Sequence, residues 1–259
     1  MTDYSLARVT TGEFARAVSS GAPLVILLPV GSVEPHGPHL GLLTDTIISQ
    51  ASAQVAARVL EAQGTTVFIA PAVPYGVTDF AAGFKGAISI PASILTAYLE
   101  AVAKGFLDNG AAHVCLVNNH LEPGHYQAIL AAAQRFAAGQ CSVACPLSRR
   151  WARTLSEEFK RGECHAGRYE TALMLAAEPG SVRREIQASL PEVPISLSDS
   201  IKAGVRRFTE MGMDSAYAGA PALATEEEGR ELLERLATMI VAEVTEGMAQ
   251  RTAVTKPQP

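Results

Sequence analysis

The chain has 259 residues, of which 48% are hydrophobic and 18% charged, and its formal net charge at pH 7 is −5. This composition is typical of a globular protein with a sizeable core. The acidic balance gives no electrostatic reason to expect a nucleic acid or an anionic membrane as a partner. The first residues lack the features of a secretory signal, and no apolar run approaches the roughly 18 residues of a membrane span. We therefore expect a cytoplasmic protein.

Hydrophobic periodicity predicts alternating strands and helices along the chain. Residues 22–32 form a continuous run of apolar side chains that ends in glycine, which is typical of a buried strand. Residues 45–64 then show helical periodicity, with Thr44 or Asp45 as the N-cap. Further strands are predicted at 65–76, 111–119 and 140–148, and further helices at 91–110, 124–139, 149–162, 168–180 and 224–251.

The order of these elements indicates an α/β protein with a mainly parallel sheet covered by helices on both faces. The stretch 181–222 is irregular, and no linker or internal repeat divides the chain. We expect one domain over residues 1–250, followed by a disordered tail at 251–259. In such sheets the ligand site lies beyond the carboxyl ends of the strands.

The four cysteines do not indicate a metal site or a disulfide. Cys141 and Cys145 are separated by three residues, but the sequence has no second cysteine pair to complete a zinc site, so a structural zinc site is not expected. Cys115 and Cys145 lie in apolar runs and are predicted to be core thiols, in keeping with a reducing compartment.

Carboxylates and imidazoles gather just after two of the predicted strands. Glu34 and His36 follow the first, His120 and Glu122 follow the third, and Asp45 begins a helix. Residues two apart in extended backbone point the same way, so each pair could serve one metal ion or two adjacent ions. Such mixed nitrogen and oxygen ligands suit zinc or manganese. A buried polar network without metal is the alternative interpretation.

Four segments resemble the creatininase (creatinine amidohydrolase) family. The stretch LPVGSVEPHGPHLGLLTDT is similar to its long signature, and VNNH is similar to its N-G-H segment. HAGRYETALML resembles the family's H-A-G-x-x-E-T segment, and GAPALATEEEGRELLE a late glycine-rich one. The four matches follow the family order over nearly the whole chain. The resemblance implies a single-domain, three-layer α/β sandwich that assembles as a homo-oligomer, often a hexamer.

The resemblance also implies a binuclear metal site with Asp45 as the bridging ligand. Glu34, Asp45 and His120 would hold the first ion, and His36, Asp45 and Glu122 the second. Two divalent ions per chain are expected, zinc or manganese above all, with iron as a further option.

Catalytic and substrate roles are implied in the same way. His165 would contact the substrate and protonate the leaving nitrogen, with Glu170 orienting it or taking part in proton transfer. Glu122 is also placed among the catalytic residues, and Thr78 would line the substrate pocket. His39 and His125 are expected to be structural or to support the ligands, and His113 to lie at the surface or its boundary.

The chain departs from creatininase in the segment before His165. Creatininase encloses its flat substrate there with tryptophans, whereas this chain has only Trp151. Cationic residues crowd the segment instead: Arg149, Arg150, Arg153, Lys160 and Arg161. They form either a solvated helix face or a site for an anionic group of the substrate. Creatinine itself is therefore doubtful as the substrate.

The resulting hypothesis is a metal-dependent hydrolase that opens a non-peptide C–N bond in a small cyclic or formylated amide. A hydroxide held between the two ions would attack the carbonyl. Two alternatives stay open. One is a related hydrolase acting on a C–C bond next to a ring ketone or on a lactone, and the other is a non-catalytic metal-binding relative.

Overall fold

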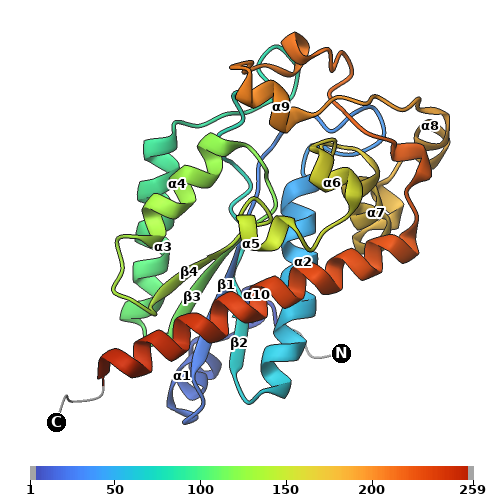
Figure 1. Ribbon diagram of the computed structural model, residues 1–259. Coiled ribbons are helices and arrows are strands. Elements are labelled where there is room, and N and C mark those ends of the chain that lie inside the picture. The colour runs from blue at the N-terminus through green and yellow to red at the C-terminus, as the bar shows by residue number, and fades with distance from the viewer. Residues whose placement is uncertain (1–3, 256–259) are drawn as a thin grey trace.

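Four parallel strands form the central sheet of the computed structural model, which describes residues 4–255 (Figure 1). The sheet order is β2-β1-β3-β4, and every neighbouring pair is parallel. In register, Leu27 of β1 lies between Ile69 of β2 and Cys115 of β3. The predicted parallel α/β sheet is thus confirmed. The strands are β1 (Leu24–Val30), β2 (Thr66–Ile69), β3 (His113–Asn118) and β4 (Cys141–Ala144).

Helices cover both faces of this sheet, because alternate residues of its buried strands point to opposite sides. Val25 and Leu27 pack into the core beneath α2, α7 and α10, whereas Ile26 and Leu28 pack beneath α3 and α4 (Figure 1). All seven residues of β1 are buried. Each large apolar side chain buried in this way contributes roughly 1.5–3 kcal/mol. These helices are α2 (Thr44–Ala62), α3 (Ala92–Asp108), α4 (Pro123–Ala133), α7 (Arg168–Ala177) and α10 (Glu226–Thr255).

Several shorter elements differ from the prediction. The segment 149–162 forms two helices, since Ser156 starts a new one by accepting a hydrogen bond from the Phe159 N–H. The irregular stretch 181–222 contains two short helices, and a further helix near the N-terminus, α1, begins with a capping box of Thr10 and Glu13. The remaining elements are α1 (Thr11–Ser19), α5 (Arg149–Ala152), α6 (Glu157–Arg161), α8 (Arg184–Ser189) and α9 (Leu197–Lys202), with 3₁₀ turns η1 (Leu6–Arg8), η2 (Pro179–Ser181), η3 (Phe208–Met211) and η4 (Pro221–Leu223).

The C-terminal helix is longer than the sequence indicates. It continues through Thr255, so a disordered tail beginning at 251 is not what the structure shows, and residues 256–259 lie outside the described range. Among the described helices, none combines the length and the apolar character that crossing a bilayer requires.

The sheet order places a topological switch point between β1 and β3. From β1 the chain crosses over to β2 on one side, and β3 then pairs with the other side of β1. In doubly wound sheets, the loops that leave the carboxyl ends of such strands diverge and open a crevice for ligands. The segments that carry Glu34 and His120 leave these two strands.

Close packing of α10 on α7 depends on Gly229. A Cβ atom at this position would lie 1.8 Å from the Ala172 carbonyl oxygen, so the two helices could not keep their present separation. By contrast, a Cβ atom at Gly105 in α3 would meet nothing within 4 Å.

We therefore expect opposite effects from the same substitution at these two helical glycines. Gly229→Ala should lower the free energy of unfolding by roughly 1–3 kcal/mol through overpacking. Gly105→Ala should raise it by about 0.5–1 kcal/mol, because alanine favours the helix where space is open. Urea denaturation followed by circular dichroism measures both. Equal effects of the two substitutions would contradict the packing described here.

Candidate metal centre

The centre lies where the loops after β1 and β3 meet the start of α2. Glu34 and His36 follow β1, His120 follows β3, and Asp45 is the second residue of α2. The loop after β1 approaches α2 closely at Gly31, where a Cβ atom would lie 2.6 Å from the Thr46 nitrogen. Only glycine permits this approach, which holds the Glu34 loop against the N-terminus of α2.

Asp45 stands between two imidazoles. Its Oδ1 lies 3.0 Å from His36 Nε2, and its Oδ2 lies 3.1 Å from His120 Nδ1. The same His120 nitrogen lies 3.1 Å from Glu34 Oε1. Ligand atoms of Glu34, Asp45 and His120 all lie within 4.8 Å of one another, so the structure brings together the first predicted ligand set. All four residues are almost fully buried.

Backbone carbonyls determine which nitrogen of each imidazole faces the carboxylates. His36 Nδ1 lies 3.0 Å from the Glu34 carbonyl oxygen, and His120 Nε2 lies 2.7 Å from that of Val77. A carbonyl only accepts hydrogen bonds, so these nitrogens carry hydrogen. In the neutral rings, His36 Nε2 and His120 Nδ1 are then unprotonated and aimed at carboxylate oxygens. Lone pairs that converge in this way at a buried site require a cation, and imidazole ligands of metals are commonly oriented by such carbonyls.

The pKa values of these groups also indicate that the site needs positive charge. Burial alone would lower the pKa of His36, but the Asp45, Glu170 and Glu34 carboxylates outweigh burial and raise it to about 10. The pKa of His120 is raised well above its usual value against the same penalty, by Glu34 and Asp45. In turn, the imidazoles hold the pKa of Asp45 below its usual range although burial opposes this. Protons or divalent ions must therefore compensate the negative charge, and Asp45 Oδ2 accepts a hydrogen bond from His120 Nδ1 only when that ring is protonated.

A second group of possible ligands contains Glu170 where the sequence predicts Glu122. Ligand atoms of His36, Asp45 and Glu170 all lie within 4.8 Å of one another, and Glu170 Oε2 is 3.5 Å from His36 Nε2. Glu170 enters from the first turn of α7 and accepts a hydrogen bond of 2.7 Å from the Ala166 N–H. Ala166 itself has a left-handed φ of 48°, an uncommon conformation for a residue with a side chain.

The Glu122 carboxylate is bound differently. It accepts hydrogen bonds from the backbone N–H groups of Asp79 and Phe80, at 3.2 and 3.1 Å. Burial raises the pKa of Glu122 to about 7, near the value that suits a group exchanging protons at neutral pH. Its carboxylate lines the same cavity as the centre but belongs to none of the ligand groups found in the described residues. The predicted role of Glu122 as a metal ligand stays a prediction.

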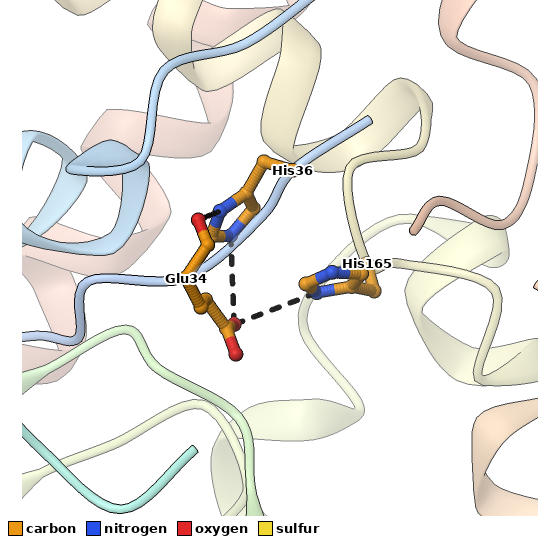
Figure 2. A group of neighbouring side chains, drawn as sticks. All are labelled: Glu34, His36 and His165. Carbon is orange, nitrogen blue, oxygen red and sulfur yellow. Dashed lines mark hydrogen bonds and ion pairs between the residues drawn. The ribbon is translucent and has the colours of Figure 1, made fainter. Parts of the chain in front are cut away.

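His165 lies beside Glu34 and His36 (Figure 2), and it lines the cavity next to the centre. Its Nε2–H donates to the Pro35 carbonyl oxygen at 3.1 Å, and its Nδ1 lies 3.7 Å from Glu34 Oε1. The ring packs against Phe208, with 4.4 Å between the centroids. Burial and the neighbouring His36 lower the pKa of His165 to about 4, so this imidazole is neutral at pH 7.

The other predicted residues lie around the centre with different roles. The Thr78 hydroxyl donates to Glu34 Oε2 and is not among the side chains that line the cavity; its predicted contact with substrate stays a prediction. His39 and His125 bond Thr171 and Asn118, respectively. His113 is fully buried rather than at the surface, because its two ring nitrogens reach the Gly139 carbonyl oxygen and Ser142 Oγ inside the fold.

A cavity of about 390 Å³ leads from the centre to the surface. Its inner end is lined by Glu34, His120, Glu122, His165 and Glu170. Its walls come from α5, α6 and the stretch 181–222, which contributes Leu197, Ser198, Ile201 and Phe208. That stretch therefore covers the centre of its own chain. Phe208 carried no signal in the sequence, because it lies in a segment without periodicity.

Comparison with known proteins assigns the chain to a family. Residues 7–244 match the family model described as "Creatininase: Creatinine amidohydrolase". The chain belongs to the creatininase family, and members of this family are hydrolases. The solved structure "Creatininase Mn" superposes with a TM-score of 0.70 over 95% of this chain and 99% of that one, at 20% identity, which confirms the fold.

Curated relatives within the family differ in the substrates that their names state. "Mycofactocin precursor peptide peptidase" of Mycobacterium tuberculosis is 31% identical over 254 residues, covering 92% of this chain and 93% of the relative. "3-dehydro-scyllo-inosose hydrolase" of Thermotoga maritima is 30% identical over 156 residues, covering 60% of this chain and 47% of the relative.

Binding of a divalent ion at pH 7 should release protons. With its pKa at about 10, His36 is protonated at neutral pH unless a metal ion takes the place of its proton. The apparent affinity for Zn²⁺ should therefore rise with pH from 6 to 8, with release of at least about one proton per chain. Calorimetric titration in two buffers of different ionisation enthalpy measures the number of protons. The His36→Asn variant should release fewer, and binding without proton release would show that the cluster does not hold the ion.

Proposed function

We propose that this chain is a binuclear metal-dependent hydrolase that cleaves an amide C–N bond. The observation that carries the proposal is the set of three buried imidazoles around the carboxylates. Each has one nitrogen tied to a backbone carbonyl and the other facing Glu34 or Asp45. Divalent ions held there supply Lewis-acid activation of water and of the amide carbonyl.

Two overlapping ligand sets support a two-ion centre. Glu34, Asp45 and His120 would hold one ion, and His36, Asp45 and Glu170 the other, with Asp45 common to both. Nitrogen and oxygen donors without thiolate favour zinc or manganese and tolerate iron. The chain's own carboxylates offset much of the charge of the two ions.

His165 and Glu122, at the inner end of the cavity, are the groups that can transfer protons. The neutral His165 presents an unprotonated Nδ1 on the side of Glu34, because its hydrogen is on Nε2. This nitrogen can first accept a proton released at the centre and then relay it to the departing nitrogen. Glu122, with its pKa near 7, can take the proton from the attacking water and return it. Two backbone N–H groups fix its carboxylate in place, so it needs no rearrangement to do this.

We infer that the scissile amide belongs to a peptide or an acylated amino acid rather than to a flat ring. Trp151 does not enclose the cavity, because its Nε1 donates to Glu243 on α10 and its ring is outside the lining. The relatives that match over nearly their whole length are named as peptidases. Cyclic and formylated amides are the second substrate class to test. Ring ketones and lactones are a third substrate class. The relative named as an inosose hydrolase supports it, although that relative matches a shorter part of the chain.

Metal content should distinguish the two candidate ligands of the second ion. Protein purified without chelator should contain about two divalent ions per chain by elemental mass spectrometry. Glu170→Gln should reduce this toward one, because it weakens the set of His36, Asp45 and Glu170. Glu122→Gln serves as the matched control and should leave the content unchanged. The opposite pattern would assign the second ion to Glu122.

Activity should depend on Glu122 independently of metal content. We expect Glu122→Gln to lower kcat about 10²–10⁴-fold on the best substrate, as loss of a general acid–base does. The panel for finding that substrate contains short peptides, N-formyl amino acids, cyclic amides, a lactone and a ring ketone. Full activity of this variant with both ions bound would exclude the proposed proton transfer. Hydrolysis of the ketone alone would overturn the amide assignment.

A further inference from the structure

The short helix α5 presents two different cationic faces. On one face, Arg150 forms two hydrogen bonds with Glu246 of α10, at 2.7 and 2.6 Å, and its guanidinium lies 4.4 Å from the centroid of the Trp151 ring. Trp151 Nε1 donates to Glu243 on the same helix at 2.6 Å. These contacts anchor α5 to α10 and fix its rotation about its own axis.

The opposite face carries Arg149 and Arg153. Residues four apart lie on the same side of a helix, so the anchored face directs these two side chains together toward the cavity that leads to the metal centre. Both are exposed, and neither guanidinium group has an ion pair or a hydrogen bond within residues 4–255. Neighbouring cations differ in this respect, since Lys160 pairs with Glu157 at 2.7 Å and Arg161 with Glu163 at 2.9 Å.

We propose that Arg149 and Arg153 form a subsite for a carboxylate of the substrate. The two guanidinium groups and the inner carboxylates and imidazoles line one cavity, and apolar side chains of Ala152, Phe159 and Ile201 lie in its walls. A molecule that fills it would place an amide at the inner end and an anionic group at the arginines. Guanidinium forks match the geometry of a carboxylate, which linear peptides with a free C-terminus and acylated amino acids carry.

The inference rests on the proposed amide hydrolase and narrows its substrates. A cavity of about 390 Å³ has room for a molecule of the size of an acylated amino acid or a dipeptide. The preferred substrate is then an N-acyl amino acid or a short peptide with its carboxylate free, and the carboxamide form of the same molecule is a poor ligand.

Equilibrium binding tests the subsite without requiring turnover. N-acetyl-leucine and N-acetyl-leucinamide are titrated by calorimetry into the metal-loaded protein, into Arg149→Gln and Arg153→Gln, and into Arg184→Gln. Arg184 is an exposed arginine outside this cavity, so its variant controls for the loss of one positive charge. We expect N-acetyl-leucine to bind the parent protein about tenfold more tightly than N-acetyl-leucinamide. Either Arg149→Gln or Arg153→Gln should lower the affinity for N-acetyl-leucine about tenfold. Arg184→Gln should change neither, and binding of the carboxamide should stay within about twofold in every variant.

The outcomes separate the subsite from the hydrolase. A preference for the carboxylate that persists in both cavity variants would place that group on the metal ions and overturn the subsite. Equal binding of the two probes by the parent protein would overturn it as well. In parallel, kcat/KM is measured for N-formyl-leucine and N-formyl-leucinamide. Hydrolysis of both at equal rates, unchanged in the cavity variants, would retain the amide hydrolase and reject the subsite. Absence of turnover of these compounds and of the short peptides in the panel, together with arginine-dependent binding, would retain the subsite and reject the hydrolase.

Discussion

Buried negative charge at the carboxyl edge of the sheet is the constraint on which the site depends. Glu34 and Asp45 are both at most 1% exposed, and leaving such carboxylates without compensation costs several kcal/mol each. The fold surrounds them with imidazoles whose other nitrogens are held by backbone carbonyls. The side chains are therefore already oriented before any ion arrives, and the free energy of ion binding is not spent on arranging them.

The parallel sheet makes this arrangement possible with few residues. The loops after β1 and β3 leave the sheet at its switch point, and α2 begins beside them. Three short segments that are distant in sequence thus meet in one place, and the missing side chain of Gly31 lets the first of them approach the helix. The helix α7 adds Glu170 from the opposite side, and the Ala166 N–H holds its carboxylate.

Much of the cavity wall is built from segments other than those that carry the possible metal ligands. Helix α5 is tied to α10 through Arg150 and Trp151, so its remaining arginines can change without disturbing the ligands. Two relatives are named for different substrates, one as a peptide peptidase and one as an inosose hydrolase. In this chain the possible metal ligands lie mainly after the strand ends, and much of the cavity wall comes from the segments between β4 and α7 and from the stretch 181–222.

The strands, the family and the grouping of Glu34, His36 and Asp45 follow from the sequence alone. The apolar run of β1 is buried throughout, and the motif after it places these three side chains at short spacings. His120 joins them because β3 pairs with β1 in the sheet. The nearness of Glu170 to His36 appears only in the tertiary structure, because Glu170 lies 134 positions away in the chain and enters from α7, whereas Glu122 follows β3. The same holds for α5. In the sequence, α5 and the Arg153 that follows it form one cationic segment, and the acidic partners on α10 select which arginines face the cavity. Hydrophobic periodicity in a sequence indicates which face of one helix or strand is buried. The side chains that distant elements place against that face depend on how the elements pack.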